Sequence, residues 1–587
     1  MLQIFKYLQK KEYLLILFSL VFIVTQVYLD LKLPDYMHEI TMLVQTEGSK
    51  MSDVLAQGGY MLLCAIGSMI ASIIVGFFAA KVAAGFSVRL RAMVFEKTMS
   101  FSIEEINGFS TASLITRSTN DITQIQLLIA MGLQVIVKAP ILAVWAVIKM
   151  MGKSWEWTAA TGFAVLFLIL MLCILIFVAM PKFKIIQSLT DNLNRVTREN
   201  LTGIRVMHAY NASNYQEKKF EEANNELTNT NLFTSRAMAI MMPTMGIIMS
   251  GMGLAIYWIG AFLINAAALP DRLSLFSDMV VFSSYAMQVI MAFMMLSFVF
   301  IMLPRASVSA KRIKEVLDTE ATIIDGNVTE GKTGLSGDIE FRNVSFKYPD
   351  AAEYILRNVS FTARKGETVA FIGSTGSGKS TLLNLIPRYF DATEGEVLVD
   401  GVNVKQYTQE TLRKKIGYVS QKAVLFSGTV TSNVAYGDNG KTSENESVVK
   451  KAIDIAQGTE FVEKMEDQYH GAIAQGGSNI SGGQKQRLSI ARAVYREPEI
   501  YIFDDSFSAL DYKTDRVLRS KLKKETKDAT TLIVGQRIGT IKDADRIVVL
   551  DEGEVVGIGT HEELMQNCSV YQEIAYSQLS KEELEIG

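Results

Sequence analysis

A glycine-rich segment carries the clearest chemical signal in this 587-residue chain. An apolar run at 369–372 leads into a Gly-x-x-x-x-Gly-Lys-Ser motif and the threonine after it, namely Gly373, Ser374, Thr375, Gly376, Ser377, Gly378, Lys379, Ser380 and Thr381. Between a strand and a helix, such glycines let backbone amides close around phosphates. The lysine reaches the β- and γ-phosphates, and the serine can ligate Mg²⁺. The segment therefore predicts a site for ATP and Mg²⁺.

Two further segments carry residues suited to phosphate and metal chemistry. Asp504 directly follows the apolar run 500–503. This is expected of a buried strand whose end delivers one carboxylate to Mg²⁺. Between this strand and the glycine loop, a second phosphate cradle opens a helix with Ser481, Gly482, Gly483 and Gln484. One nucleotide cannot be held by both cradles of one chain if they lie far apart. We therefore expect the nucleotide to lie between two such domains.

The elements that position these residues form a domain of alternating strands and helices. Residues 339–344 and 359–362 alternate as strands do, and a helix is expected to follow the glycine loop near Leu382. We expect this domain to span 337–587. The stretch 305–336 is predicted to be a linker, because it contains a charged amphipathic helix followed by glycine-rich turns.

Six long apolar runs in the first half of the chain predict membrane-spanning helices, since a hydrocarbon core of about 30 Å needs roughly 20 apolar residues. The runs lie roughly at 13–34, 59–80, 128–149, 158–180, 240–264 and 279–303. The intervening segments 86–126 and 181–236 are rich in Lys and Arg and are expected to continue the helices. The positive-inside rule therefore places both termini in the cytoplasm.

Composition supports the same division. Residues 1–304 hold 22 Lys and Arg and 19 Asp and Glu, whereas 305–587 hold 36 and 42. A chain that is 49% apolar and 20% charged is neither disordered nor a nucleic-acid-coating protein. We expect a membrane domain over 1–304 in the cell membrane, a cytoplasmic domain after it, and no nucleic-acid partner.

The signature Ile480-Ser-Gly-Gly-Gln484, together with the glycine loop, resembles the ATP-binding cassette (ABC) transporter family. The similarity is to exporter-type half-transporters, and it covers nearly the whole chain because Gly203-Ile-Arg-Val206 and 114–121 are similar to that family's intracellular segments. It implies an all-α six-helix transmembrane domain fused to an α/β P-loop ATPase domain.

The resemblance also implies roles for single residues. Tyr348 would stack on adenine, and Asp511 would belong to the D-loop. Gln421 would sense Mg²⁺ and contact the membrane domain. The metal site would then be formed by Ser380, Gln421 and Asp504.

Two positions depart from the family pattern at the hydrolysis centre. Hydrolysing members have a glutamate after the metal-site aspartate, where it polarises or deprotonates the attacking water, but this chain has Asp505. Aspartate is one methylene shorter, and a general base must come within about 3.2 Å of the water. Gln536 replaces the family's switch histidine with a neutral amide. We therefore expect a site that binds ATP well and hydrolyses it poorly.

These departures predict a heterodimer. In the family's head-to-tail dimer, each site would combine the glycine loop, metal-site aspartate and switch of one chain with the signature of the other. A homodimer would hold two impaired sites, which is hard to reconcile with a pump driven by hydrolysis. We expect a second half-transporter that supplies a glutamate and a histidine to a competent site, completed by Ser481–Gln484 of this chain. The chain resembles the degenerate-site subunit of a heterodimeric multidrug exporter.

The last two apolar runs suggest the kind of substrate. Twelve of the 28 methionines lie between Met238 and Met302, and flexible thioethers suit varied hydrophobic or amphiphilic ligands. Lys138 lies midway through the third run, where a charge is costly, so it should face a watery cavity or a partner chain. We expect Lys138, Gln134 and Gln288 to line the substrate cavity.

Two other functions stay open. A lipid or peptide exporter would have the same architecture. An ATP-gated channel or regulatory subunit would also explain slow hydrolysis, although no long regulatory insertion interrupts the chain.

Overall fold

The chain forms two compact units in a computed structural model that describes residues 2–46, 48–151, 153–349, 351–437 and 445–578. Unit 1 comprises Met1–Met99 and Ala112–Thr319, and unit 2 comprises Ser100–Thr111 and Glu320–Gly587. This division differs from the expected domain bounds of 1–304 and 337–587. The last helix of unit 1 continues to Asp318, because residues 305–318 are mostly good helix formers and contain no glycine.

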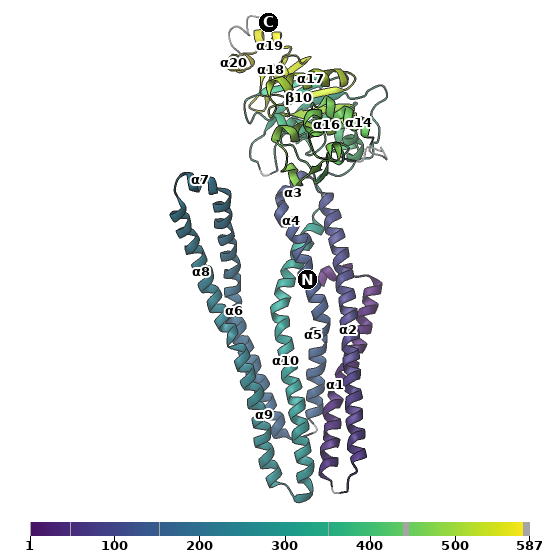
Figure 1. The fold of residues 1–587 in the computed structure, drawn as a ribbon, viewed down its shortest axis with the longest axis vertical. Coiled ribbons are helices and arrows are strands. Elements are labelled where there is room, and N and C mark those ends of the chain that lie inside the picture. The colour runs from purple at the N-terminus through teal and green to yellow at the C-terminus, as the bar shows by residue number, and fades with distance from the viewer. Residues whose placement is uncertain (1, 47, 152, 350, 438–444, 579–587) are drawn as a thin grey trace. The chain divides into compact units, whose positions relative to one another are not determined.

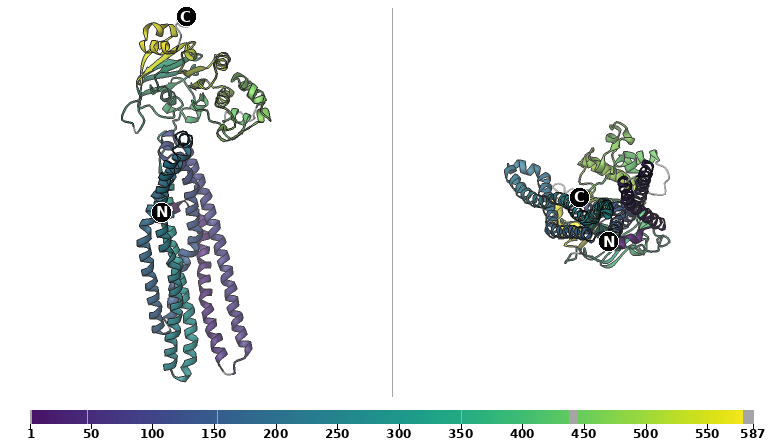
Figure 2. Two further views of the ribbon diagram at one scale, coloured as in Figure 1. Left: turned by 60° about the vertical axis from the view of Figure 1, so that its left-hand side comes forward. Right: turned by 90° about the horizontal axis from the view of Figure 1, so that it is seen from below.

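Unit 1 is built from long helices, shown in Figures 1 and 2. Their bounds are η1 Leu2–Tyr7, α1 Lys10–Gln45, α2 Met51–Met99, α4 Thr111–Ser118, α5 Asn120–Met150, α6 Trp155–Thr202, α7 Ile204–Ala209, α8 Ser213–Ala239, α9 Met241–Ala266 and α10 Leu269–Asp318. Within the described part of the chain, six helical segments are long and apolar enough to cross a membrane, as predicted. They also extend well beyond the predicted runs, which is most evident for α2 and α6.

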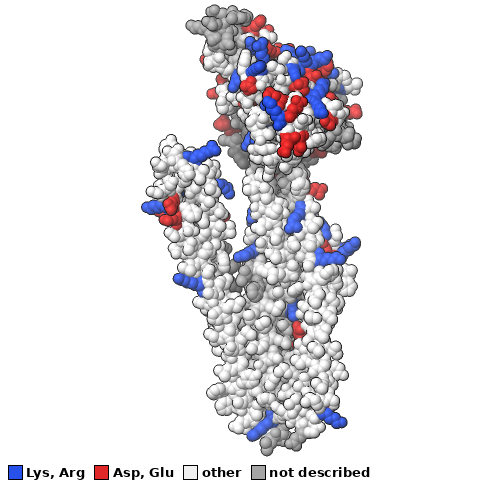
Figure 3. Space-filling model, viewed as in Figure 1, with Lys and Arg blue, Asp and Glu red and all other residues white. Residues whose placement is uncertain are grey.

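The helices of unit 1 form two groups that meet where α6 and α9 pack on α10. Helix α1 packs on α2, and α5 packs on α10, while α6 packs on α8 and α9. Trp157 is fully buried, its ring lies 5.5 Å from that of Phe282, and its indole N–H donates to the Ile256 carbonyl at 3.1 Å. Large apolar side chains are exposed along the outer surfaces of the helices, where charged residues are sparse (Figure 3). Such a surface is suited to lipid.

Unit 2 contains a mixed sheet of six strands, a sheet of four strands and a short two-stranded ribbon. The strand bounds are β1 Ile339–Phe346, β2 Leu356–Ala363, β3 Thr368–Gly373, β4 Glu394–Val399, β5 Val402–Asn403, β6 Ile416–Val419, β7 Gly428–Thr429, β8 Ala472–Ile473, β9 Ile500–Asp504, β10 Thr530–Val534, β11 Arg546–Asp551 and β12 Glu554–Gly559. The larger sheet has the order β12-β11-β3-β10-β9-β6, and only its edge strand β12 is antiparallel. The strands expected at 339–344, 359–362, 369–372 and 500–503 are all present.

Helices flank these sheets. Their bounds are α3 Ile103–Phe109, α11 Lys379–Leu385, α12 Gln409–Lys414, α13 Val430–Val434, α14 Glu446–Ile455, α15 Thr459–Glu463, α16 Gly482–Arg496, α17 Tyr512–Glu525, α18 Ile538–Ile541, α19 His561–Asn567 and α20 Ser569–Gln578. Three 3₁₀ turns, η2 Val404–Gln406, η3 Gln468–His470 and η4 Gln475–Gly477, complete the unit.

Helix α3 belongs to unit 2 although it lies in sequence between α2 and α4. Ile103 packs against the core of the sheets, and the buried Glu105 accepts hydrogen bonds from the backbone N–H groups of Ser102 at 2.6 Å and Thr322 at 2.9 Å. Burial opposes ionisation of this side chain, but these hydrogen bonds hold the pKa of Glu105 below its usual value. A segment between two membrane-unit helices is thereby fixed to the soluble domain.

Candidate functional site

The parallel strands of the six-stranded sheet bring the predicted site residues to one edge. Val534 of β10 pairs with Phe371 of β3 on one side and with Asp504 of β9 on the other, and Val419 of β6 pairs with Phe503. Because parallel strands end at the same edge, the segments after β3, β6, β9 and β10 meet there. These segments carry the glycine loop, Gln421, the pair Asp504 and Asp505, and Gln536.

The glycine loop has the backbone geometry of a phosphate cradle. Gly378, at the start of α11, has φ +92°, and a Cβ there would meet the Ile355 carbonyl at 3.0 Å and a methyl of Leu356 at 2.7 Å. The position therefore requires glycine. The Lys379 ammonium donates to the carbonyls of Gly373 at 3.0 Å and Ser374 at 2.7 Å, and so lies folded over the loop. Burial lowers the pKa of Lys379, and the nearby Asp505 and Asp504 oppose this shift.

Two oxygen atoms suited to Mg²⁺ lie next to this loop. The Ser380 hydroxyl donates to Asp504 Oδ1 at 2.8 Å, and Asp504 is 5% exposed. Burial raises the pKa of Asp504, while the Ser380 hydrogen bond lowers it and the charge of Asp505 raises it further. Among the described residues no group of three or more His, Cys, Asp or Glu side chains could hold a metal. The site therefore fits Mg²⁺ that takes its remaining ligands from phosphates and water.

The tyrosine at the end of β6 was missed by the sequence analysis. The Tyr418 hydroxyl lies 3.1 Å from Asn384 Oδ1 and 3.4 Å from Asp504 Oδ2, and burial raises its pKa. The only available signal was its place three residues before Gln421 at the end of an apolar run. Tyr418 therefore helps to position the metal-site carboxylate.

Asp505 is held by the two segments beside it that carry Gln421 and Gln536. Its Oδ2 atom accepts a hydrogen bond from Gln536 Nε2 at 2.7 Å and another from Gln421 Nε2 at 3.1 Å. The residue is 7% exposed and has φ +49°, a left-handed conformation that is unusual outside glycine. Burial raises its pKa, which the hydrogen bonds from Gln421 and Ser508 oppose. One carboxylate oxygen is thus shared by two neutral amides.

Tyr348 lies beside the glycine loop, where an adenine-stacking residue is expected. Its hydroxyl is 3.1 Å from the hydroxyl oxygen of Thr381, and its ring meets those of Phe346 and Phe390 edge-on, with centroids at 5.0 and 5.2 Å. The ring is half-buried and keeps one part of its surface accessible.

The signature lies on a different part of unit 2. Ser481 and Gln484 form a reciprocal cap at the start of α16: the Ser481 N–H donates to Gln484 Oε1 at 2.8 Å, and the Gln484 N–H donates to the Ser481 hydroxyl. In the parts of the chain that the structure describes, no hydrogen bond or ion pair joins residues 481–484 to the loop 373–381. A Cβ on Gly483 would touch the Ala509 carbonyl, and Asp511 nearby in sequence caps α17. The cradle of Gly482 and its neighbours is thus separate from that of Lys379.

In unit 1, two of the three residues expected in a substrate cavity meet at Asp30. The Lys138 ammonium lies 3.0 Å from Asp30 Oδ2, and Gln288 Nε2 donates to the Asp30 carbonyl at 3.3 Å, while the Ser68 hydroxyl donates to the same carboxylate. Gln134 lies instead against Gly76 of α2. Asp30 was missed as a partner although it lies within the first predicted run, because hydropathy does not show that α1 packs on α5, the helix of Lys138.

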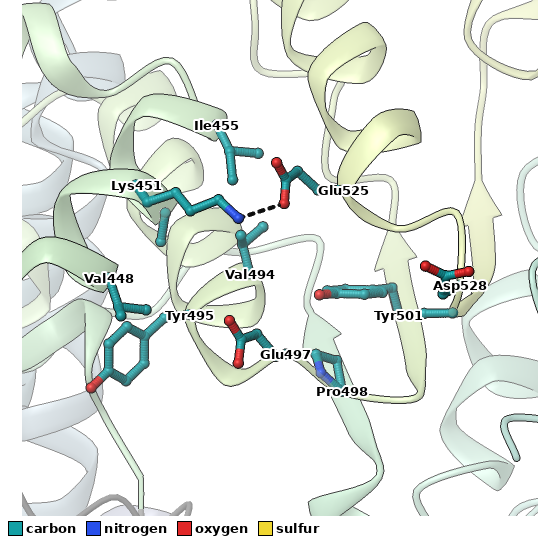
Figure 4. A pocket seen from close by; sticks show the side chains of 12 residues that line it. Val448, Lys451, Ile455, Val494, Tyr495, Glu497, Pro498, Tyr501, Glu525 and Asp528 are labelled. Carbon is teal, nitrogen blue, oxygen red and sulfur yellow. Dashed lines mark hydrogen bonds and ion pairs between the residues drawn. The ribbon is translucent and has the colours of Figure 1, made fainter. Parts of the chain in front are cut away.

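A separate cavity of about 240 Å³ opens near the other end of β9 (Figure 4). The Lys451–Glu525 ion pair, at 2.8 Å, and the buried Tyr501 are among the side chains that line it. None of the predicted nucleotide-binding residues lines it. The predicted nucleotide-binding residues therefore lie apart from this cavity.

Comparisons with known proteins agree with this architecture. Residues 356–508 match the family model described as ABC transporter, and residues 14–293 match that of the ABC transporter transmembrane region. An uncharacterized ABC transporter ATP-binding protein of Mycobacterium tuberculosis is 40% identical over 532 residues, which cover 89% of this chain and 88% of the relative. An ATP-dependent lipid A-core flippase of Pseudomonas aeruginosa is 30% identical, over 87% of this chain and 83% of the flippase.

A solved structure has the same fold. It is that of a bacterial Atm1-family ABC exporter with ATP bound, with a TM-score of 0.81 over 97% of this chain and 99% of that one. The sequence identity is 22%, so the likeness extends to the fold alone.

Acidification should weaken Mg²⁺-dependent ATP binding at a higher pH than an ordinary aspartate would cause. Protons compete with Mg²⁺ for the Asp504 carboxylate, whose pKa is raised above its usual value. ATP affinity would be measured with and without Mg²⁺ between about pH 8 and pH 5. Because ATP phosphates also titrate, Asp504→Asn serves as the baseline. If the effect of Mg²⁺ on ATP affinity has the same pH profile in the native protein and in Asp504→Asn, the assignment of Asp504 as a Mg²⁺ ligand is contradicted.

Replacing Lys138 alone should destabilise unit 1 more than replacing it together with Asp30. Lys138→Met leaves the Asp30 carboxylate without its counter-charge, which costs up to a few kcal/mol in this partly buried pair, whereas removing both partners is often nearly neutral. Thermal unfolding in detergent would compare Lys138→Met with Lys138→Met/Asp30→Leu, and Lys11→Met, at an exposed lysine, is the control. If the double variant unfolds at the same temperature as Lys138→Met, Lys138 and Asp30 do not stabilise unit 1 as an ion pair.

Proposed function

The chain belongs to the ABC transporter family, and we propose that it is the slowly hydrolysing half of a heterodimeric exporter. The chain is an ATP-driven exporter subunit, a multi-pass membrane protein whose ATPase domain is cytoplasmic. Beyond this, we propose which of two nucleotide sites hydrolyses ATP, what kind of chain is the partner, and which class of substrate is transported.

The hydrogen bonding of Asp505 carries the proposal. A general base must reach the attacking water and have a free lone pair directed at it. Here the shorter carboxylate already accepts two amide hydrogen bonds on Oδ2, and Gln536 cannot provide the positive charge of a protonated imidazole. The features that bind ATP, including the Gly378 turn and the Ser380–Asp504 pair, remain intact. The site is therefore suited to retaining ATP rather than cleaving it.

The intact signature supports a partner that differs from this chain. Ser481 caps α16 and leaves the Gly482 and Gly483 amides at the start of the helix, where they would meet the phosphates of a nucleotide on another chain. A second half-transporter with a glutamate and a histidine at the positions of Asp505 and Gln536 would give one competent site. Two copies of this chain would have none.

The substrate class is hydrophobic or amphiphilic. The methionines of α9 and α10 include Met252 and Met279 in the core and Met291 at the surface, so this wall of the unit is flexible and polarisable. A multidrug range fits such a wall. A lipid substrate is the second candidate, favoured by the 30% identity to a protein named for flipping lipid A-core.

Restoring the family residues should accelerate hydrolysis at this chain's own site. Loss of a general base costs about 10²- to 10⁴-fold, so Asp505→Glu/Gln536→His should raise ATP turnover by up to about 100-fold over the native chain purified alone. Phosphate release would be measured in lipid nanodiscs. The same two changes combined with Lys379→Ala should remain at the basal level. Robust, transport-coupled ATPase activity of the unmodified chain alone would contradict the proposal.

Transport by the complete complex should be vectorial. Inside-out vesicles that contain this chain and its partner half-transporter should accumulate a fluorescent amphiphile against its gradient only when ATP is present. Movement that only dissipates a gradient would indicate an ATP-gated channel instead. Labelled lipid and peptide substrates in the same vesicles would separate the remaining alternatives.

A further inference from the structure

One side chain of the C-terminal helix α20 holds the segment that carries Gln536. We call residues 535–538 the switch segment. The Gln578 amide N–H donates to the Gln536 carbonyl at 2.8 Å, and its Oε1 accepts from the Ile538 N–H at 2.9 Å. A glutamine amide offers both a donor and an acceptor, so it can pair with the backbone on both sides of Arg537. The pairing of β10 with β3 ends at Val534. Beyond that residue, Gln578 supplies hydrogen bonds to the backbone of the switch segment.

Helix α20 is itself firmly fixed to the sheet. Tyr571 and Ala575 are fully buried against β3 and β11, and Gln578 follows at the same helical spacing, so all three lie on one face. The Tyr571 hydroxyl lies 2.7 Å from His561 Nδ1, and Gln572 Nε2 donates to the Met565 carbonyl at 2.8 Å. The helix is therefore a rigid support from which Gln578 reaches the switch segment.

The contact is the last in a chain of hydrogen bonds that leads to the nucleotide site. Gln578 bonds the Gln536 backbone, the Gln536 side chain bonds Asp505, and Gln421 bonds the same carboxylate oxygen. The Gly535 N–H donates to the Phe371 carbonyl of β3 at 3.1 Å, which fixes the amino end of the switch segment. Its carboxyl end is fixed by the fully buried Ile538, which begins α18, and Gln578 holds the backbone between these two anchors.

Packing does not account for this contact. The Gln578 side chain is exposed, unlike Tyr571 and Ala575, so its removal would leave no cavity in the core. What it contributes is the pair of hydrogen bonds to the switch segment. Its effect should therefore be confined to the position of that segment.

We propose that Gln578 is a positioning residue and that α20 controls how long nucleotide stays at this chain's site. With Gln578 in place, the switch segment is held against Asp505 and the Gln536 amide stays beside the phosphate-binding edge of the sheet. Without it, the backbone of Gln536 and Arg537 between the two anchors is held less firmly, the Gln536 amide spends less time beside Asp505, and the nucleotide leaves sooner. The inference deepens the proposed function, since it concerns the site that retains ATP, but it does not require that hydrolysis there be slow.

Amide hydrogen exchange in the full-length chain tests the contact. Gln578→Ala should speed exchange of the Ile538 N–H by about two- to tenfold, the range expected for one hydrogen bond. Gln578→Glu keeps the acceptor and should retain most of the protection of Ile538. Gln572→Ala, which alters α20 without touching the switch segment, should leave it unchanged. If the Ile538 N–H exchanges at the same rate in the native chain and in all three variants, the inferred Gln578 contact is wrong.

Nucleotide release tests the consequence. A radiolabelled, non-hydrolysable ATP analogue should dissociate about two- to tenfold faster from Gln578→Ala than from the native chain or Gln572→Ala. Altered exchange with unaltered release would reduce Gln578 to a structural role and overturn the proposal. Because the analogue is not cleaved, rapid hydrolysis of ATP by the native chain would contradict the proposed function without affecting this comparison.

Discussion

The parallel pairing of β3, β10, β9 and β6 is the constraint on which the rest of the site depends. Backbone hydrogen bonds fix the register of four strands that are up to 166 residues apart in sequence, from 368 to 534. Because all four strands run in the same direction, the glycine loop, the Asp504 carboxylate and the two glutamine segments lie at one edge. A change of register between any two of these strands would separate Ser380 from Asp504, or Gln536 from Asp505, even with every side chain unchanged.

In the function proposed above, the identity of two residues at that edge decides between cleaving and holding a nucleotide. Asp505 lies where a base is expected, yet its Oδ2 atom is engaged by Gln421 and Gln536, which belong to segments after two different strands. The same hydrogen bonds join these segments to one another through the carboxylate. If nucleotide binding moves the segment of Gln421 or that of Gln536, the shared Asp505 carboxylate should therefore transmit the movement to the other segment. In the same domain, Glu105 fixes α3, a segment continuous in sequence with α2 and α4, so the domain holds part of the chain between two membrane-unit helices.

The sequence predicted those features that local patterns determine. The six apolar runs, the strand before Gly373 and the helix opened by Ser481 follow from hydropathy, spacing and capping chemistry, and the structure confirms each. The partners that lie far apart in the chain could not be predicted in this way. Asp30 pairs with Lys138 because α1 packs on α5, and Tyr418 reaches Asp504 from the neighbouring strand β6. Gln578 carries no motif, and its role depends on how α20 packs against β3 and β11.

The central claim is that this chain's nucleotide site retains ATP while a partner's site cleaves it. The most direct measurement is a single-turnover, rapid-quench experiment on the complete complex, loaded with labelled ATP at both sites and then sampled for ATP and ADP. The account predicts two phases, in which about half of the bound ATP is converted quickly and the remainder persists at least about 100 times longer. Conversion of all bound ATP in one phase with a single rate constant would contradict it.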